Sequence, residues 1–238
     1  MKNYSITLPS YSIGDNVYSK IGEICEPYGK KVICIGGKTA ISKVRDLIIN
    51  ECNGTSLEIL DFLWYGGDAT YENVNTLKEN ELVKKADIIF GIGGGKALDT
   101  AKALAYITNK DIFTFPTIAS NCAGTTAVSI MYNADGSFKE PFFFTAPARH
   151  CFIYTPVIAK SPAKYMWAGI GDTYAKYFEA EMSSRGEDLV HYHALGVTTS
   201  QMCLTPLLKY GKKALDDFKS GTASFEVEQV VLGIVVTT

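Results

Sequence analysis

Hydrophobic residues in the first half of the chain form short continuous runs, and each run ends at glycine or at a polar segment with helical character. Apolar runs of this kind occupy 31–35, 57–64, 86–92 and 112–115. Segments with the spacing of helices lie between them, at 42–49, 71–85 and 97–107. Apolar runs bounded by glycine are typical of parallel strands buried on both faces. The alternation of strand and helix therefore predicts a doubly wound α/β domain.

The pattern changes near residue 129. Two apolar segments, SIMY and PFFF, flank a turn at Asp135-Gly136, which has the chemistry of a β-hairpin connection. One more strand is predicted at 151–154, ended by Pro156. The sequence thus predicts a hairpin that follows the sheet, and then a last strand.

Only helices are predicted beyond residue 160. Ser161-Pro162 is a typical helix start, with serine as the cap and proline at the first helical position. Ser224, followed by acidic residues in the next turn, predicts another start. The predicted helices span roughly 162–184, 188–211 and 225–238. We expect an α/β domain over 1–160 and the beginning of an all-helical domain over 161–238.

The last helix ends in an apolar segment without a cap or a polar tail. Such a helix needs partners to cover it. The expectation from sequence is therefore that the helical domain is incomplete and that the chain is a fragment, a truncated version of a longer protein, or the product of a reading frame that stops early.

Composition narrows the function classes. Apolar residues make up 47% of the chain, and the net charge of -2 gives no basic surface for nucleic acid or for a membrane. No apolar run is long enough to span a bilayer, and the N-terminus lacks the apolar core of a signal peptide. No two cysteines form a C-x-x-C pair, which argues against a disulfide framework and favours the cytoplasm. The six cysteines are Cys25, Cys34, Cys52, Cys122, Cys151 and Cys203.

The most informative segment is a strand that runs into three glycines, 93–95, and then into a helix. Glycines let the backbone approach a ligand, and a helix N-terminus favours negative charge, so the segment suits a phosphate or pyrophosphate. It is not a P-loop, since Phe90 and Ala97 replace the required residues, nor a G-x-G-x-x-G fingerprint, since Lys96 and Leu98 occupy the glycine positions. The alternative is a turn that serves only strand–helix packing.

The segment GIGGGKALDTAKA at 91–103 resembles the signature of the glycerol dehydrogenase group within the iron-containing alcohol dehydrogenases. Further segments resemble the same family in the same order: 115–120, 127–132 with Asp135-Gly136, and 168–173 with 177–180. The resemblance covers essentially the whole chain. It implies a Rossmann-like nucleotide-binding domain followed by an all-α domain, the architecture shared with dehydroquinate synthase.

The resemblance also implies an activity and a site. An enzyme of this family binds NAD or NADP and a divalent metal, zinc or iron, and oxidises a small alcohol or polyol by hydride transfer, usually as a homo-oligomer. By resemblance, the pyrophosphate is held by Gly94, Gly95 and Lys96. The adenine, ribose and nicotinamide path is lined by Thr117, Ser120, Thr126, Val128 and Tyr132. Asp172 is the first metal ligand by resemblance; the alternative is an aspartate at a helix start, after Gly171.

The chain departs from the family at the metal site. The family completes that site with two histidines further along, whereas this chain holds only His150, His191 and His193, none in a matching context. His191 and His193 are two positions apart on a predicted helix and point to different faces. A catalytic zinc takes three protein ligands, so we expect weak metal binding and poor turnover from this chain.

Two further departures concern specificity. Glycerol-specific members carry an aspartate at Cys122, and a thiol is a poor acceptor for a polyol hydroxyl. The cysteine-bearing loop resembles that of relatives that reduce 2-oxo acids; the alternative is that Cys122 is a small packing residue in the cleft wall.

NAD-preferring members often carry an aspartate at the position of Gly37, and this aspartate accepts a hydrogen bond from the ribose 2′-hydroxyl. Gly37 beside Lys38 removes that barrier, so NADPH is expected to bind.

Two other functions stay open from sequence. One is a non-catalytic nucleotide-binding remnant, favoured by the missing histidines. The other is a lyase like dehydroquinate synthase, which shares the architecture and uses NAD transiently.

Overall fold

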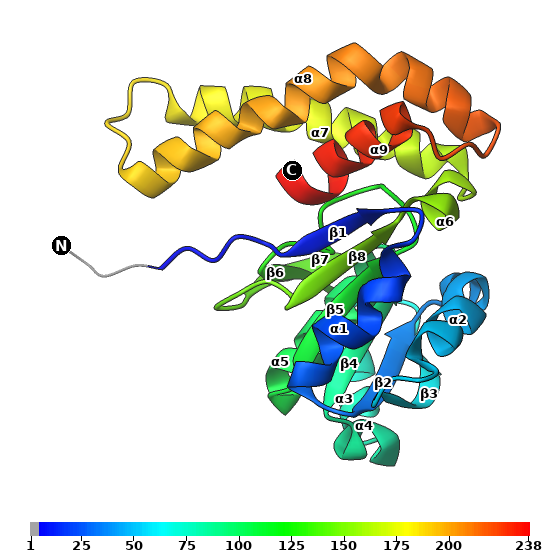
Figure 1. Cartoon of the computed structure of the whole chain (residues 1–238). Helices are drawn as coiled ribbons and strands as arrows, with labels where there is room; N and C mark the ends of the chain where they lie inside the picture. Colours follow the sequence, from blue (N-terminus) through cyan, green and yellow to red (C-terminus); the bar gives the residue numbers. More distant parts are fainter. Residues whose placement is uncertain (1–4) are drawn as a thin grey trace.

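The computed structural model describes residues 5–238 and contains a parallel six-stranded sheet (Figure 1). The spatial order is β1-β8-β5-β4-β2-β3, and every neighbouring pair runs parallel. The strands are β1 (Tyr11–Gly14), β2 (Lys31–Gly36), β3 (Glu58–Trp64), β4 (Ile88–Gly93), β5 (Asp111–Pro116) and β8 (His150–Tyr154). The predicted doubly wound α/β architecture is confirmed. β1 was not predicted.

The central strands are buried on both faces because each feeds two cores. Cys34, Phe90 and Phe113 belong to one core, whereas their neighbours Ile35 and Ile89 belong to the other. Successive side chains of a strand point to opposite faces, so a continuous apolar run serves both cores. Each such side chain stabilises the fold by roughly 1.5–3 kcal/mol relative to an exposed one.

Helices cover both faces of the sheet. α1 and α2 contribute to the core that contains Phe90, and α3, α4 and α5 contribute to the core that contains Ile89. These helices are α1 (Ile21–Cys25), α2 (Lys38–Cys52), α3 (Tyr71–Lys78), α4 (Glu81–Lys85) and α5 (Gly95–Thr108), with short 3-10 segments η1 (Val17–Lys20) and η2 (Glu26–Tyr28) before β2.

The single helix predicted over 71–85 is wrong. The chain breaks after α3, and Asn80 starts α4 by accepting hydrogen bonds from the backbone N–H groups of Leu82 and Val83 at 2.8 and 3.4 Å. The side-chain oxygen of an N-cap asparagine competes with helix continuation. The helix predicted at 42–49 is longer, and spans all of α2.

The predicted hairpin is confirmed. β6 (Val128–Tyr132) and β7 (Phe138–Phe143) pair antiparallel in a sheet of their own. Gly136 in the connecting turn has φ +82°, a conformation that glycine adopts without strain.

From residue 155 the described elements are helical. They are α6 (Thr155–Ala159), α7 (Ala163–Ser184), α8 (His191–Lys219), α9 (Phe225–Leu232) and the π-helical turn η3 (Gly233–Thr237). In Figure 1, α7, α8 and α9 form a layer beside the β1–β8 edge of the sheet. Pro162 is the residue before α7 and not its first helical position, so the predicted start is off by one; α8 runs on to Lys219.

The apolar end of the chain is covered within this structure. Val227, Val230 and Ile234 are fully buried in a core that α9 and η3 share with α8 and with Ile153 of β8. The expectation that this helix needs covering is therefore met by elements of the chain itself. Its predicted start is confirmed, since Ser224 Oγ accepts from the Val227 N–H at 3.2 Å.

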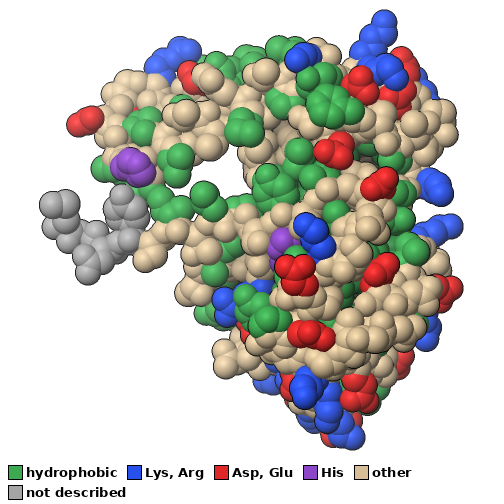
Figure 2. Space-filling view, viewed as in Figure 1, with side chains coloured by type: hydrophobic (Ala, Val, Ile, Leu, Met, Phe, Trp, Pro, Cys, Tyr) green, Lys and Arg blue, Asp and Glu red, His purple; other side chains and the backbone are tan. Residues whose placement is uncertain are grey.

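Charged side chains of both signs are spread over the α/β part, and apolar side chains gather around the helical layer and its junction with the sheet (Figure 2). No helix in residues 5–238 is long and apolar enough to cross a membrane.

We expect His150 to make stability depend on pH. Its ring contacts Ser10 Oγ at 2.7 Å and Ser12 Oγ at 3.0 Å, and burial, with a smaller effect of Lys20, lowers its pKa from 6.5 to about 4. The unfolded chain then binds more protons between these values, so the free energy of unfolding should fall as pH falls from 6.5 toward 4. Urea denaturation over this range should show a smaller pH dependence for His150→Gln; equal dependence in both proteins would contradict the assignment.

Candidate functional site

A cavity of about 630 Å³ opens at the carboxyl ends of β2 and β4. β2 continues outward to β3 on one side, and β4 continues to β5 on the other, so the strand order reverses between them. In open α/β sheets, ligands bind outside the carboxyl ends of the strands at such a reversal. α2 and α5 both begin there, each from a glycine cap, Gly37 and Gly94.

The glycine turn leaves backbone where side chains would otherwise fill the cavity edge. Gly93 has φ +141°, which disfavours any other residue. A Cβ on Gly94 would lie 2.6 Å from Ile118 Cδ1, and one on Gly95 would lie 2.6 Å from Asn121 Nδ2. α5 follows with no acidic residue in its first turn, so its free N–H groups and its dipole favour an anion. The arrangement fits a pyrophosphate.

Lys96 brings a cation to the same edge. Its ammonium lies 2.6 Å from Asp68 Oδ2 and 4.7 Å from the centre of the Tyr132 ring. The hydrogen bond to Asp68 raises the pKa of Lys96, so the group stays charged. Sequence reasoning missed Asp68, which is 28 residues away in the chain and follows the glycine pair at the end of β3.

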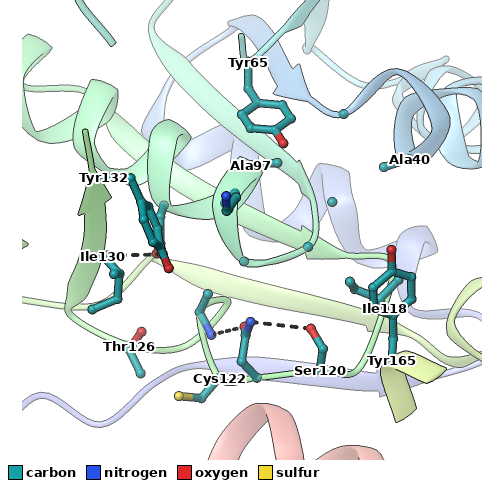
Figure 3. A pocket seen from close by; sticks show the side chains of 18 of the residues that line it. Ala40, Tyr65, Ala97, Ile118, Ser120, Cys122, Thr126, Ile130, Tyr132 and Tyr165 are labelled. Atoms are coloured by element: carbon teal, nitrogen blue, oxygen red, sulfur yellow. Dashed lines mark hydrogen bonds between the residues drawn. The ribbon is translucent and has the colours of Figure 1, made fainter. Parts of the chain in front are cut away.

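The structure gathers most of the residues expected at the site. The cavity is lined by the predicted residues Gly37, Gly94, Gly95, Lys96, Ser120, Cys122, Thr126, Val128 and Tyr132. Thr126 and Tyr132 lie at one end, and Ile118 and Tyr165 at the other (Figure 3). Thr117 instead lines an adjoining cavity of about 650 Å³, which shares Ile118 and Tyr165 with the first.

Several lining residues were not expected. Tyr65 follows β3, Ile130 lies on β6, and Tyr165 belongs to α7. Their aromatic or apolar character is equally typical of core positions, so nothing local in the sequence distinguishes them.

Asp172 lines neither cavity, although its charge reaches the site. Burial is the main cause that raises the pKa of Cys122; Lys102 opposes it, and Asp172 adds to it. Asp172 lies in the interior of α7, so the alternative that it is a helix-start aspartate is wrong. Its carboxylate is 47% exposed and pairs with Lys176 at 3.4 Å.

The described residues do not form a metal site. No group of three His, Cys, Asp or Glu side chains within 5–238 is placed to hold an ion. His191 and His193 lie in the first turn of α8, and His150 is held between two serines on β1 and its approach. A divalent metal therefore does not fit the donor set present here.

Comparison with known proteins adds evidence from outside the chain. The family model for iron-containing alcohol dehydrogenases matches residues 9–151. The chain is similar to a glycerol dehydrogenase of Escherichia coli, 27% identical over 225 residues, which is 93% of this chain and 61% of that protein. It is also similar to an Escherichia coli hydroxycarboxylate dehydrogenase A, 36% identical over 131 residues, which is 55% of this chain and 36% of that protein.

The fold is shared with solved structures. The crystal structure of glycerol dehydrogenase from Schizosaccharomyces pombe matches with a TM-score of 0.86 and 23% identity, over 100% of this chain and 61% of that one. The chain thus spans about three-fifths of the length of this structure and of the first curated relative.

We expect Gly36 and Gly37 to differ sharply in what they tolerate. A Cβ on Gly36 would lie 2.4 Å from the backbone oxygen of Ile92, whereas a Cβ on Gly37 meets nothing closer than 3.8 Å. Gly36→Ala should lower the free energy of unfolding by about 2 kcal/mol or more, since backbone cannot yield cheaply. Gly37→Ala, the matched control, should stay within about 1 kcal/mol of wild type. Urea denaturation measures both, and equal stabilities would refute the close approach of β2 and β4.

Proposed function

Since the chain belongs to the iron-containing alcohol dehydrogenase family, we propose that the cavity between α2 and α5 binds NAD or NADP. The observation that carries the proposal is the glycine turn at the N-terminus of α5, which opens into the cavity where the strand order reverses. Gly94 and Gly95 would hold the pyrophosphate by their backbone, and Lys96 would add its charge. Lys96 can exchange Asp68 for a phosphate because this ion pair is partly exposed.

The two halves of the cofactor would lie on opposite sides of this turn. Thr117, in the adjoining cavity, suits the adenosine half. Ser120, Thr126, Val128 and Tyr132 suit the path to the nicotinamide. We further propose that residues 1–160 are the dinucleotide-binding domain and that 161–238 belong to the substrate domain, which supplies Tyr165 to the cavity wall.

The proposed reaction is the interconversion of a small alcohol or polyol and its carbonyl. Bound here, the nicotinamide would exchange a hydride with the carbon that carries the oxygen. Cys122 would lie in the wall beside the substrate and, as a half-buried thiol with a raised pKa, would be uncharged. That a homo-oligomer carries out this reaction in the cytoplasm stays a prediction.

A second candidate substrate is a 2-hydroxy acid. Cys122 lines the cavity where an aspartate would accept from a polyol hydroxyl, and a neutral thiol does not repel a substrate carboxylate. The similarity to hydroxycarboxylate dehydrogenase A supports the same substrate class. Turnover of glycerol against a short 2-oxo acid, measured with one enzyme preparation, separates the two.

We expect this chain to bind a divalent metal weakly. Asp172 is the one ligand assigned by resemblance, and Lys176 already pairs with it. Three protein ligands hold a catalytic zinc, so a single partly exposed carboxylate is insufficient. Elemental analysis after purification and dialysis should find far less than one metal per chain. One tightly held metal per chain would contradict the prediction, and turnover without it would favour the dehydrogenase over the non-catalytic remnant.

We expect the site to tolerate NADPH in addition to NADH. The first turn of α2 carries no acidic residue, and the Lys38 ammonium lies 4.7 Å from the Trp64 ring centre. Gly37→Asp should weaken NADPH binding about tenfold or more, because the carboxylate repels the 2′-phosphate, and should leave NADH within about twofold. Fluorescence titration of the reduced cofactors measures both affinities, with Gly37→Asn as the uncharged control. Binding of NADH with no measurable NADPH binding by the wild type would overturn this.

A further inference from the structure

Two opposite charges are buried in α5 at the cavity wall, which Asp99 helps to line. Asp99 and Lys102 lie one turn apart, and their side chains are 9% and 2% exposed. The Lys102 ammonium lies 2.9 Å from Asp99 Oδ1. Taking such a pair out of water costs several kcal/mol per ion, and apolar residues of similar size would often be no less stable. The pair therefore calls for a role beyond filling the core.

The contacts of the pair converge on one segment, 126–130. Lys102 Nζ donates to the Val128 carbonyl at 2.5 Å and lies 3.3 Å from Thr126 Oγ1. Asp99 Oδ2 accepts from the Ile130 N–H at 3.2 Å. The backbone oxygen of Asp99 accepts from Ser129 Oγ at 2.9 Å. The side chains of α5 thus hold the backbone edge of the first hairpin strand, and the α5 backbone holds its Ser129 side chain.

These hydrogen bonds connect two sides of the cavity. Gly94 and Gly95 open α5 on one side, while Thr126, Val128 and Ile130 line the wall on another side. β6 and β7 form a sheet separate from the main one, so no strand ladder fixes their position relative to the glycine turn. A backbone hydrogen bond from the Tyr132 N–H to the Ala69 carbonyl at 2.9 Å holds the far end of β6. Asp99 and Lys102 contact the near end, which follows Thr125, whose hydroxyl donates to the carbonyls of Cys122 and Val235.

We propose that Asp99 and Lys102 are positioning residues that fix segment 126–130 at a set distance from the glycine turn, and so select cofactors by their nicotinamide half. The proposal rests on the proposed function. Hydrogen bonds to a charged group are directional, whereas an apolar contact would let the strand slide along the helix. Burial raises the pKa of Asp99 and the Lys102 charge opposes that effect, which is consistent with a pair that depends on both partners.

The test compares two ligands that differ only in the nicotinamide ring, which ADP-ribose lacks. Lys102→Met removes the ammonium and keeps an apolar stem of similar length. Affinities for NADH and for ADP-ribose are measured by calorimetry on the folded full chain. NADH should bind about tenfold or more weakly to the variant, and ADP-ribose within about twofold of wild type. A purely structural role would weaken both ligands or neither, and either result overturns the proposal.

Two further variants sharpen the test. Lys110→Met is the matched control and should change neither affinity. Lys110 follows α5, and its ammonium donates a 2.5 Å hydrogen bond to the Ala86 carbonyl, away from the cavity. Should Lys102→Met fail to fold, Ser129→Ala removes only the hydroxyl that contacts the Asp99 carbonyl. It should weaken NADH alone, by a smaller factor, and a loss shared with ADP-ribose overturns the proposal.

Hydrogen exchange separates this proposal from the proposed function. Without any ligand, Lys102→Met or Ser129→Ala should speed amide exchange over 126–130 and leave β4 unchanged. If the wild type binds neither ADP-ribose nor NADH, the proposed function fails. The exchange rates then still decide the positioning role, and unchanged exchange over 126–130 overturns it.

Discussion

The close approach of α5 to strand β4 is the constraint on which the site depends. A Cβ on Gly91 would lie 2.9 Å from the Ala101 Cβ, so the helix packs against bare strand backbone. Gly36 on β2 lies closer still to the Ile92 carbonyl. Because helix and strand lie this close, the turn that joins them must be short and must adopt the conformation of Gly93. The helix N-terminus is thereby presented to the cavity rather than to solvent.

One helix then organises both ends of the proposed cofactor site. Its first turn offers backbone N–H groups to an anion, and its second turn holds the hairpin through Asp99 and Lys102. The two lysines of this helix differ in their surroundings. Lys96 is 45% exposed and can change partners, whereas Lys102 is 2% exposed and stays bound to the oxygens of Asp99 and Val128. Exposed ion pairs contribute little to stability, while breaking a buried one is costly.

The helical layer contributes fewer metal ligands than the resemblance to the family implies. Tyr165 lines the cavity and Asp172 influences Cys122, yet the carboxylate pairs with Lys176 on its own helix. The layer is well packed all the same, since α9 and η3 bury Val230 and Ile234 against α8 and β8. A stable core and a complete metal site are separate requirements, and residues 5–238 meet the first without the second.

Features that depend on consecutive residues could be predicted from the sequence. Continuous apolar runs specify buried parallel strands, Asp135-Gly136 specifies the hairpin turn, Ser224 specifies a helix start, and the glycines at 93–95 specify the turn from β4 into α5. Edge strand β1 was not predicted, because its four residues are only partly buried and contain no apolar run. Tertiary structure alone decided which distant groups meet: Asp68 with Lys96, and Lys102 with the carbonyl of Val128. Such contacts join residues more than 20 positions apart, and local pattern carries no signal for them, since their energies depend on burial and distance that only the folded chain provides.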